Sequence, residues 1–331
     1  MVYIYKKTIG NKEYYYLRAS KTEKGRMITK DVAYLGSTLE EVKKSLNKIP
    51  KAQIRAAYKK INKFLESNKY LKEAQKLKIK QTALLDEDLS EEIEACQLHW
   101  QKIFKKLDKK TQEDYFKGFI IDFAFNTASI EGNTITLKEA SMLLTEQRTP
   151  KNRTLREIYD IQNTESAFRG LLVGKKSLTH EFIIQTHKEL MVNIDFRHGY
   201  RTSDVHVMHS RFEASPAHYV FTDMNILIKW YNENKNKLHP FILACIFHHK
   251  FEKIHPFFDG NGRTGRMLMN FILLNENYPP IIIRKRNRAE YLEALNRADG
   301  AGLKDIPIKS YKPLIEFSAN EYTDGYWDIF L

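Results

Sequence analysis

The sequence predicts a mainly helical protein that begins with a small module containing β-strands. A series of segments between residues 91 and 298 carries apolar residues at a spacing of about 3.6, the period of an α-helix with one buried face. Ser, Thr, Asp or Asn precedes many of these segments, as is typical of helix starts. The chain has only 14 glycines and 9 prolines, so no long flexible linker is expected. The predicted helices are 91–107, 112–126, 137–144, 155–172, 180–191, 225–231, 240–253, 263–276 and 288–298.

The first 37 residues predict two β-hairpins. Tyrosine-rich, strand-forming stretches lie on both sides of the turn-forming pair Gly10-Asn11. A second hairpin is expected across Lys24-Gly25 into residues 32–35. From residue 38 to about residue 67 the pattern changes to helices, with a break before or at Pro50.

The positive charge of the chain is concentrated in its N-terminal part. The formal net charge is +13, yet residues 1–80 hold 21 Lys+Arg against 7 Asp+Glu, which leaves 33 against 34 for the remainder. A basic, tyrosine-rich sheet suits a nucleic-acid backbone or an acidic partner. Lysine and arginine also coat small domains simply to keep them in solution, so both interpretations stay open.

Residues 255–266 form the most informative stretch, His-Pro-Phe-Phe-Asp-Gly-Asn-Gly-Arg-Thr-Gly-Arg. Gly260 and Gly262 are expected to take positive φ and to present their N–H groups as an anion nest. The apolar helix that follows would direct its positive N-terminus at that nest. The stretch therefore predicts a phosphate site.

Four charged or titratable side chains of this stretch supply what a polyphosphate reaction needs. Arg263 and Arg266 are charge-assisted donors three residues apart on one helix face. Asp259 suits a hard cation such as Mg²⁺, which prefers one or two carboxylates with phosphate oxygens and waters. His255 has an ordinary pKa close to working pH and is a candidate general base. Together they predict metal-assisted attack on a nucleotide phosphate.

The whole stretch resembles the signature of the Fic (Fido) family, His-Pro-Phe-x-Asp-Gly-Asn-Gly-Arg-x-x-Arg, and meets every specified position. The resemblance covers roughly residues 120 to 315 and includes the helix 244–252, the flap strand 199–207, the segment 278–284 and Tyr291. It implies an all-α Fic core with a β-hairpin flap, preceded by the basic module.

The resemblance implies transfer of AMP from ATP to a Ser, Thr or Tyr hydroxyl of a target protein. His255 would be the base and Asp259 would hold Mg²⁺. The flap residues Val205, His206 and Val207 would align the target as an added strand. The residues implied to bind the nucleotide are Gly260, Asn261, Gly262, Arg263, Arg266 and Tyr291.

Residues 127–133, Thr-Ala-Ser-Ile-Glu-Gly-Asn, resemble the inhibitory motif Ser/Thr-x-x-x-Glu-Gly/Asn of the family. In such proteins the glutamate, here Glu131, pairs with the second arginine of the loop, here Arg266, and competes with the γ-phosphate. A carboxylate and a phosphate oxygen repel each other at one guanidinium. The alternative is an ordinary helix end with Gly132 just past the last turn; beside the complete loop, the inhibitory interpretation is preferred.

Several questions stay open at this point. The same site, with Glu131 positioning a water, would also remove AMP from a target. Asp299 stands where relatives carry an amide near the nucleoside, which leaves the choice of adenine uncertain because an ionised carboxylate cannot donate. A regulator that senses nucleotide and binds nucleic acid through residues 1–80 is the alternative function, and homodimer formation is undecided.

A zinc site is a weaker interpretation of the nearby histidines. His248 and His249 are adjacent on a predicted helix and therefore point about 100° apart. The step from His248 to His255 crosses into the loop, so the i, i+4 pair of a zinc hydrolase is not formed. His248 or His249 is instead expected to be a packed or capping residue behind the loop.

The domain boundaries follow from these assignments. No run approaches the roughly 18 apolar residues of a membrane helix, and the start lacks the apolar core of a signal peptide. Cys96 and Cys245 are too few for a disulfide framework, so reduced thiols, a cytoplasmic location and no membrane contact are expected. The predicted regions are a basic β module 1–37, a helical connector 38–115, inhibitory helices 116–176, a catalytic core 177–315 and a C-terminal tail 316–331.

Overall fold

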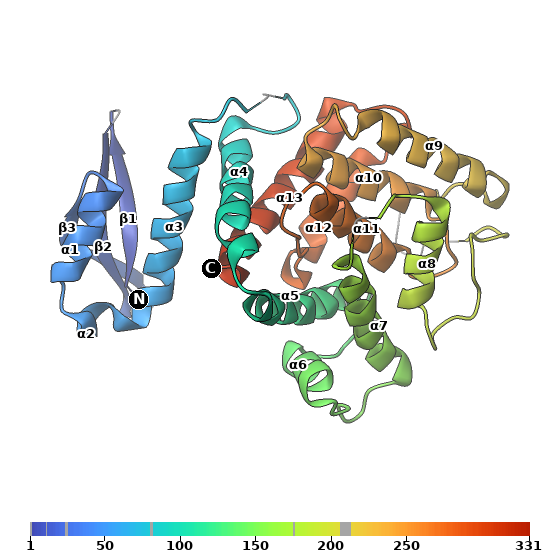
Figure 1. Ribbon diagram of the computed structural model, residues 1–331, viewed down its shortest axis with the longest axis horizontal. Helices are drawn as coiled ribbons and strands as arrows, with labels where there is room; N and C mark the ends of the chain where they lie inside the picture. The colour runs from blue at the N-terminus through green and yellow to red at the C-terminus, as the bar shows by residue number, and fades with distance from the viewer. Residues whose placement is uncertain (1, 11, 24–25, 80–81, 175, 206–212) are drawn as a thin grey trace.

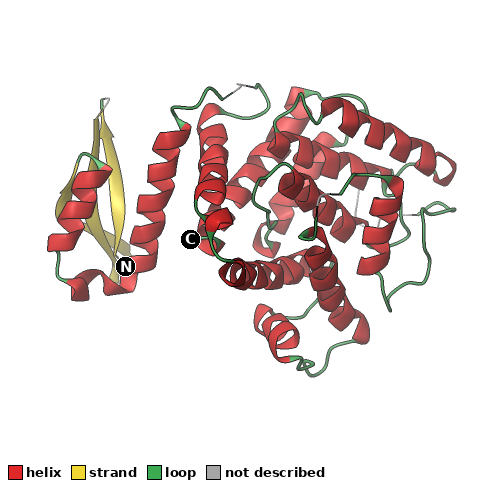
Figure 2. Ribbon diagram, viewed as in Figure 1, coloured by secondary structure: helices red, strands yellow, loops and turns green. Residues whose placement is uncertain are grey.

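The computed structural model describes residues 2–10, 12–23, 26–79, 82–174, 176–205 and 213–331. A three-stranded sheet lies at one end of the molecule and a large helical body at the other (Figure 1). Figure 2 shows that, in the described part of the chain, strands are confined to the N-terminal end. The predicted fold class, mainly helical after a small β-containing module, is confirmed.

The sheet consists of β1 (Val2–Ile9), β2 (Lys12–Glu23) and β3 (Arg26–Gly36), paired antiparallel in the order β1-β2-β3. Both predicted hairpins are therefore present. One face of the sheet buries Ile4, Tyr15 and Leu17 in a cluster with residues of the helices that follow. These helices are α1 (Leu39–Lys48), α2 (Lys51–Ile54) and α3 (Tyr58–Ala74).

Helix α3 joins the sheet to the helical body (Figure 1). Its residue Ile61 belongs to the cluster under the sheet, whereas Tyr70 and Ala74 belong to the main core. The hydrophobic core of the N-terminal module thus runs well past residue 37, through the helices up to Ile61. The domain boundaries themselves remain predictions.

The helical body holds the rest of the described chain. Helix α10 is buried on nearly all sides and packs against α11, as expected for a helix that is apolar around its whole circumference. The helices are α4 (Glu87–Lys102), α5 (Lys109–Ile130), α6 (Leu137–Glu146), α7 (Leu155–Leu171), α8 (His180–Leu190), α9 (Val220–Asn234), α10 (Pro240–Ile254), α11 (Asn261–Asn275), α12 (Arg288–Ala298) and α13 (Ile308–Ile329). Short 3₁₀ helices span Arg55–Ala57, Phe104–Lys106, Ala217–Tyr219 and Lys285–Asn287.

The C-terminal segment differs from its prediction. Residues 316–331 were expected to form a tail, but most of them continue the 22-residue helix α13, which packs along α4. The apolar residues Tyr311, Ile315, Ala319, Tyr322 and Tyr326 follow a helical spacing and are buried. Pro313 inside the helix removes one backbone hydrogen bond, and the burial of these rings outweighs that cost.

The predicted flap is only partly visible. Residues 199–205 form bends without strand structure, and Val205 is half-buried there. His206 and Val207 lie outside the described residues, so the flap strand stays a prediction.

Two other expectations concern thiols and membranes. Cys96 and Cys245 are both buried and unpaired with each other. Among the helices of the described residues, none combines the length and the apolar character needed to cross a bilayer.

Candidate functional site

The loop between α10 and α11 is shaped by two residues in the left-handed region. His255 ends α10 with φ 53°, and Gly260 precedes α11 with φ 76°. The positive φ favours glycine at this position, and a Cβ there would lie 2.7 Å from Met191 Sδ, so the Met191 side chain would also have to shift.

Gly262 does not have the positive φ that was predicted for it, because it already belongs to the first turn of α11. Its missing side chain matters for a different reason. A Cβ at this position would collide with the Glu131 carboxylate and would stand 3.1 Å from Arg266 Nη1. A carboxylate therefore fills the space in front of the first turn of α11.

Three side chains hold the loop in this shape. Asn261 Oδ1 accepts from the Phe257 N–H at 2.9 Å, and Asn261 Nδ2 donates to the Phe257 carbonyl at 2.8 Å. His187 Nε2 contacts the Asp259 carbonyl at 2.9 Å, and its ring stacks on Phe257 with 3.6 Å between centroids. Arg201 Nε donates to the His255 carbonyl at 2.8 Å. The Asn261 side chain, predicted to face a phosphate, is thus used to fix the loop.

His255 is arranged as a base. Its Nδ1 lies 3.4 Å from the Glu252 carbonyl oxygen, which can only accept, so the neutral ring carries its proton on Nδ1 and its lone pair on Nε2. Burial lowers the pKa of His255, although the Glu252 carbonyl acts in the opposite sense. The imidazole is therefore neutral near pH 7 and competent to accept a proton.

Arg266 is the buried cation of the site. Its Nε donates to Thr127 Oγ1 at 2.7 Å, and its Nη2 donates to the Thr127 carbonyl at 3.1 Å and to Glu131 Oε1 at 2.7 Å. The Arg266 side chain is 3% exposed, whereas the Glu131 side chain is 45% exposed. Burial lowers the pKa of Arg266, but the Glu131 carboxylate together with other nearby groups more than offsets this, so the net pKa is raised. The predicted pairing of Glu131 with Arg266 is present.

The end of α5 delivers Glu131 to this position. Gly132 has φ 99°, the Gly132 N–H bonds the Ser129 carbonyl at 3.2 Å, and the Asn133 N–H bonds the Ala128 carbonyl at 3.1 Å. This pattern is a Schellman motif. The two interpretations of the segment are therefore compatible, because the helix stop is what places the glutamate.

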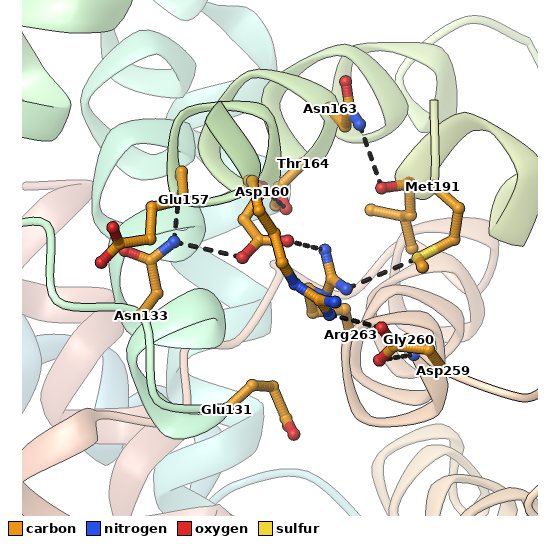
Figure 3. Close-up of polar contacts among 12 residues, drawn as sticks. Glu131, Asn133, Glu157, Asp160, Asn163, Thr164, Met191, Asp259, Gly260 and Arg263 are labelled. Atoms are coloured by element: carbon orange, nitrogen blue, oxygen red, sulfur yellow. Dashed lines mark hydrogen bonds and ion pairs between the residues drawn. The ribbon is translucent and has the colours of Figure 1, made fainter. Parts of the chain in front are cut away.

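Arg263 has a different environment (Figure 3). It forms an ion pair with Asp160 of α7, and its Nη2 lies 3.5 Å from Met191 Sδ. Asn133 donates to the other Asp160 oxygen at 3.2 Å. Both charged side chains are buried, with 3% of Arg263 and 12% of Asp160 exposed. Burial raises the pKa of Asp160, while Arg263 and Asn133 act in the opposite direction.

Asp259 is an ionised carboxylate at the edge of the loop. It forms an ion pair with Arg156 of α7, and its Oδ1 accepts from the Gly260 N–H at 2.6 Å. Burial raises the pKa of Asp259, but Arg156, Arg263 and the Gly260 N–H together outweigh it and the net pKa is lowered. In the described part of the chain, no group of three or more His, Cys, Asp or Glu side chains is placed to hold a metal. One ionised carboxylate nevertheless fits Mg²⁺ that takes its other ligands from phosphate and water.

The predicted nucleoside end of the site is closely packed. Tyr291 is buried, and its hydroxyl lies 2.5 Å from His248 Nε2 and 3.5 Å from Arg266 Nη1. His249 Nε2 lies 3.0 Å from Asp299 Oδ1. His248 and His249 are thus packed behind the loop, as expected, and Asp299 already has a donor.

Glu252 is a buried carboxyl that the sequence did not single out. It lies one turn before the loop, and its Oε1 has no hydrogen-bond partner among the described residues. Burial raises the pKa of Glu252 to about 8, although Arg266 acts in the opposite sense. Glu252 is therefore protonated at neutral pH.

Sequence reasoning missed most of the residues that support the loop. They come from helices or turns 50 to 110 residues earlier in the chain, so only the folded structure brings them together. They are Arg156, Asp160, His187 and Arg201. Polar or charged residues such as Asp160 and Asn163 within an otherwise apolar helix face were the available signal.

The loop 255–266 lies within a segment that matches a known family. The Fic/DOC family matches residues 177–273. A protein adenylyltransferase, fic-1 of Caenorhabditis elegans, is 29% identical over 204 residues, which are 60% of this chain and 39% of that protein. The protein adenylyltransferase Fic of Drosophila grimshawi is 30% identical over 235 residues, 68% of this chain and 44% of that protein. The chain therefore spans about two fifths of the length of these curated relatives.

Solved structures share the fold. A Fic domain containing signaling protein from Bacteroides thetaiotaomicron superposes with a TM-score of 0.65 at 25% identity, covering 71% of this chain and 95% of that one. Fic-1 from C. elegans superposes with a TM-score of 0.61 at 22% identity, covering 88% of this chain and 76% of that one.

Proposed function

Because this chain carries a Fic/DOC family domain over residues 177–273, we propose that it transfers AMP from ATP to a Ser, Thr or Tyr hydroxyl of a target protein and that Glu131 holds this activity off. Relatives that match most of the helical body bear the name protein adenylyltransferase. ATP and a protein hydroxyl are accordingly the substrates.

One observation supports the proposal most strongly, namely the position of the Glu131 carboxylate. It pairs with Arg266 at 2.7 Å and stands against Gly262 in the first turn of α11. A guanidinium together with a helix N-terminus is the environment that binds phosphate. Glu131 thus takes the place of a terminal phosphate oxygen, and the γ-phosphate of ATP has to displace it.

The loop supplies the chemistry. His255 Nε2 accepts the proton of the target hydroxyl, whose oxygen then attacks the α-phosphorus. The bond from the α-phosphorus to the bridging oxygen of the β-phosphate breaks, and pyrophosphate leaves. N–H groups at the start of α11 stabilise the charge that develops on the α-phosphate, and Arg266, freed from Glu131, binds the departing phosphates. Arg263 adds positive charge behind the loop.

Asp259 is the residue that would hold Mg²⁺, which supplies charge neutralisation on the phosphates when bound. Arg156 occupies this carboxylate and has to release it. The segment around Val205, His206 and Val207 is proposed to align the target. Tyr291, whose hydroxyl contacts Arg266, is proposed to hold that guanidinium in position for the nucleotide.

Autolabelling with α-labelled ATP and Mg²⁺ tests the function. The wild type, Glu131→Gly and the double variant Glu131→Gly with His255→Ala are compared. Strong label is expected in the single variant alone, because glycine frees Arg266 and alanine removes the base. Equal label in all three proteins, or none in Glu131→Gly despite measurable ATP binding, would contradict the proposal.

Removal of AMP is the second candidate, and one observation favours it. The Glu131 carboxylate is 45% exposed and close enough to His255 to oppose the lowering of the His255 pKa by burial, so it is able to orient a water beside the base. A target that already carries AMP would lose it in the presence of the wild type, and Glu131→Gly would lose this activity while gaining label. If Glu131→Gly removes AMP as fast as the wild type, the hydrolytic role fails.

A further inference from the structure

The N-terminal sheet has one covered face and one face that carries tyrosines. Successive side chains of a strand point to opposite faces. Ile4 and Leu17 are paired across β1 and β2 and lie buried on the helix side, so the next pair, Tyr5 and Tyr16, points the other way. We name this second face the tyrosine face. Its residues include Tyr3, Tyr5, Lys7, Tyr14, Tyr16, Arg18 and Tyr34.

The aromatic rings and cations of this face are held in a defined arrangement. Tyr16 and Tyr34 have ring centroids 5.3 Å apart. The Arg18 guanidinium carbon lies 3.5 Å from the centre of the Tyr5 ring, and Arg18 Nε pairs with Asp31 at 2.6 Å. Tyr34 remains 54% exposed. An exposed tyrosine beside several half-buried ones, arranged next to cations, favours a binding face over a solvated sheet.

Two shallow hollows combine tyrosine and lysine in the N-terminal module, one between the sheet and α3 and one at the sheet and the turn that follows it. One, of about 660 Å³, is lined by Tyr3, Ser20, Lys21, Thr22, Met27 and Lys60. The other, of about 540 Å³, is lined by Lys12, Glu13, Tyr14, Tyr34 and Ser37. They belong to the part of the chain, residues 1–80, in which 21 basic residues face 7 acidic ones.

We propose that the tyrosine face binds single-stranded nucleic acid. Base rings would stack on the exposed Tyr34 and on the half-buried tyrosines beside it, and phosphates would contact the surrounding lysines. In a duplex the bases stack on one another and offer only their edges, so the tyrosine rings would have nothing to stack on. An acidic protein would complement the positive charge of the module but would offer no flat rings to stack on its tyrosines. A single strand offers both negative phosphates and unstacked bases.

This binding is independent of AMP transfer. The sheet lies at the far end of the molecule from α10 and α11 (Figure 1), and no residue of the tyrosine face enters the loop that carries His255. The site would tether the Fic domain to nucleic acid, whatever the target of the domain is. Loss of one activity is therefore separable from loss of the other.

Fluorescence anisotropy of the full-length protein with labelled single strands tests the proposal. The probes are oligo(dT) and oligo(U) of about 15 nucleotides, a duplex of the same length and a polyglutamate of matched charge. The variants are Tyr14→Ser and Tyr34→Ser, with Tyr34→Phe as the conservative change that keeps the ring. Tyr58→Ser is the matched control, because Tyr58 is 43% exposed and lies in the same module at the start of α3, outside the sheet.

We expect single strands to bind more tightly than the duplex, and affinity to fall between about 50 and 200 mM salt. Each Tyr→Ser change on the tyrosine face should weaken binding about tenfold, the size of one lost stack. Tyr34→Phe and Tyr58→Ser should stay within about twofold of the wild type. Melting curves of each variant exclude unfolding as the cause.

Three results would overturn the proposal. They are absence of single-strand binding at low salt, tighter binding of the duplex or of polyglutamate, and equal affinity of Tyr14→Ser, Tyr34→Ser and Tyr58→Ser. The last would show that charge alone binds the strand. None of these results bears on autolabelling by Glu131→Gly.

Discussion

The two arginines of the loop, three residues apart, meet carboxylates in opposite ways. Arg263 and Asp160 are both buried, and Asn133 supports the carboxylate from the other side. Arg266 is equally buried, but its partner Glu131 is 45% exposed and lies at the end of a helix. Because a buried pair cannot separate without leaving a charge in the interior, Arg263–Asp160 stabilises the fold. Arg266–Glu131 can separate, because water and a phosphate are available to replace the partner.

This difference in burial means that Arg263 stabilises the fold, whereas Arg266 is available to bind the nucleotide. Both fit the same sequence motif equally well. Only the burial of the partner distinguishes them, and burial depends on α5 and α7, which lie far from the loop in sequence.

The largest difference is expected in stability. Asp160→Ala leaves Arg263 buried without a partner and should lower the free energy of unfolding by about 3–5 kcal/mol. Glu131→Ala removes a half-exposed carboxylate and should lower it by less than about 1 kcal/mol. Urea denaturation of the three proteins measures both. Similar losses for the two variants would remove the distinction between the pairs.

A second carboxyl near Arg266, that of Glu252, is expected to make the stability of the protein depend on pH. Glu252 has a folded pKa of about 8 against an ordinary value of 4.5, so the native state binds a proton that the unfolded state releases. Stability from this group is present below pH 4.5 and is lost as pH rises towards 8. Glu252→Gln cannot ionise, so across this window the wild type should lose about 4 kcal/mol relative to the variant.

Thermal unfolding of the wild type and Glu252→Gln between these pH values measures this loss. Glu92→Gln is the matched control, because burial raises the pKa of Glu92 too, on a helix away from the loop. Parallel pH curves for the wild type and Glu252→Gln would show that Glu252 is ionised in the native state.

Thr127 is expected to contribute to holding Arg266. Thr127→Val keeps the shape and removes the acceptor of the 2.7 Å bond from Arg266 Nε, which should lower the free energy of unfolding by about 1–2 kcal/mol. Thr145→Val, on the exposed side of α6, is the control and should change little. A smaller effect at Thr127 than at Thr145 would mean that Glu131 alone orients the guanidinium.

Arg156 is expected to oppose a cation at Asp259. Arg156→Gln removes the positive charge beside the carboxylate and should tighten binding of Mn²⁺, as a spectroscopic substitute for Mg²⁺, by about threefold, the size of a partly exposed ion pair. Electron paramagnetic resonance of free Mn²⁺ measures this without any reaction. Arg148→Gln, whose pair with Glu146 is exposed, is the control. Unchanged or weaker Mn²⁺ binding in Arg156→Gln would place the cation elsewhere.

The sequence predicted the site where the information is local. The loop 255–266 contains its own turn, charges and base. Gly132 predicts the end of the helix, and the residue just before it, Glu131, is the one that pairs with Arg266. Prediction was wrong at Gly262, whose importance lies in the space it leaves for Glu131 and not in its φ. It missed Asp160 and Arg156 because their partners are 103 residues away in the chain.

The fold shows the same division. The hairpins around Gly10-Asn11 and Lys24-Gly25 were readable from turn residues and strand formers. Helix α13 was not predicted, because Pro313 disfavours a helix in the sequence and the packing of this segment against α4 is visible only in the fold.

The most direct test of the account is the affinity for ATP of a protein without Glu131's charge. Calorimetry would compare His255→Ala with His255→Ala combined with Glu131→Gln, so that no transfer occurs and the shape of the side chain is kept. If Glu131 occupies the position of the γ-phosphate, the variant with Glu131→Gln binds ATP about tenfold more tightly. This is the effect expected when Arg266 loses one charge-assisted hydrogen-bond partner that competes with the phosphate. Equal or weaker binding would show that the Glu131–Arg266 pair does not compete with the nucleotide.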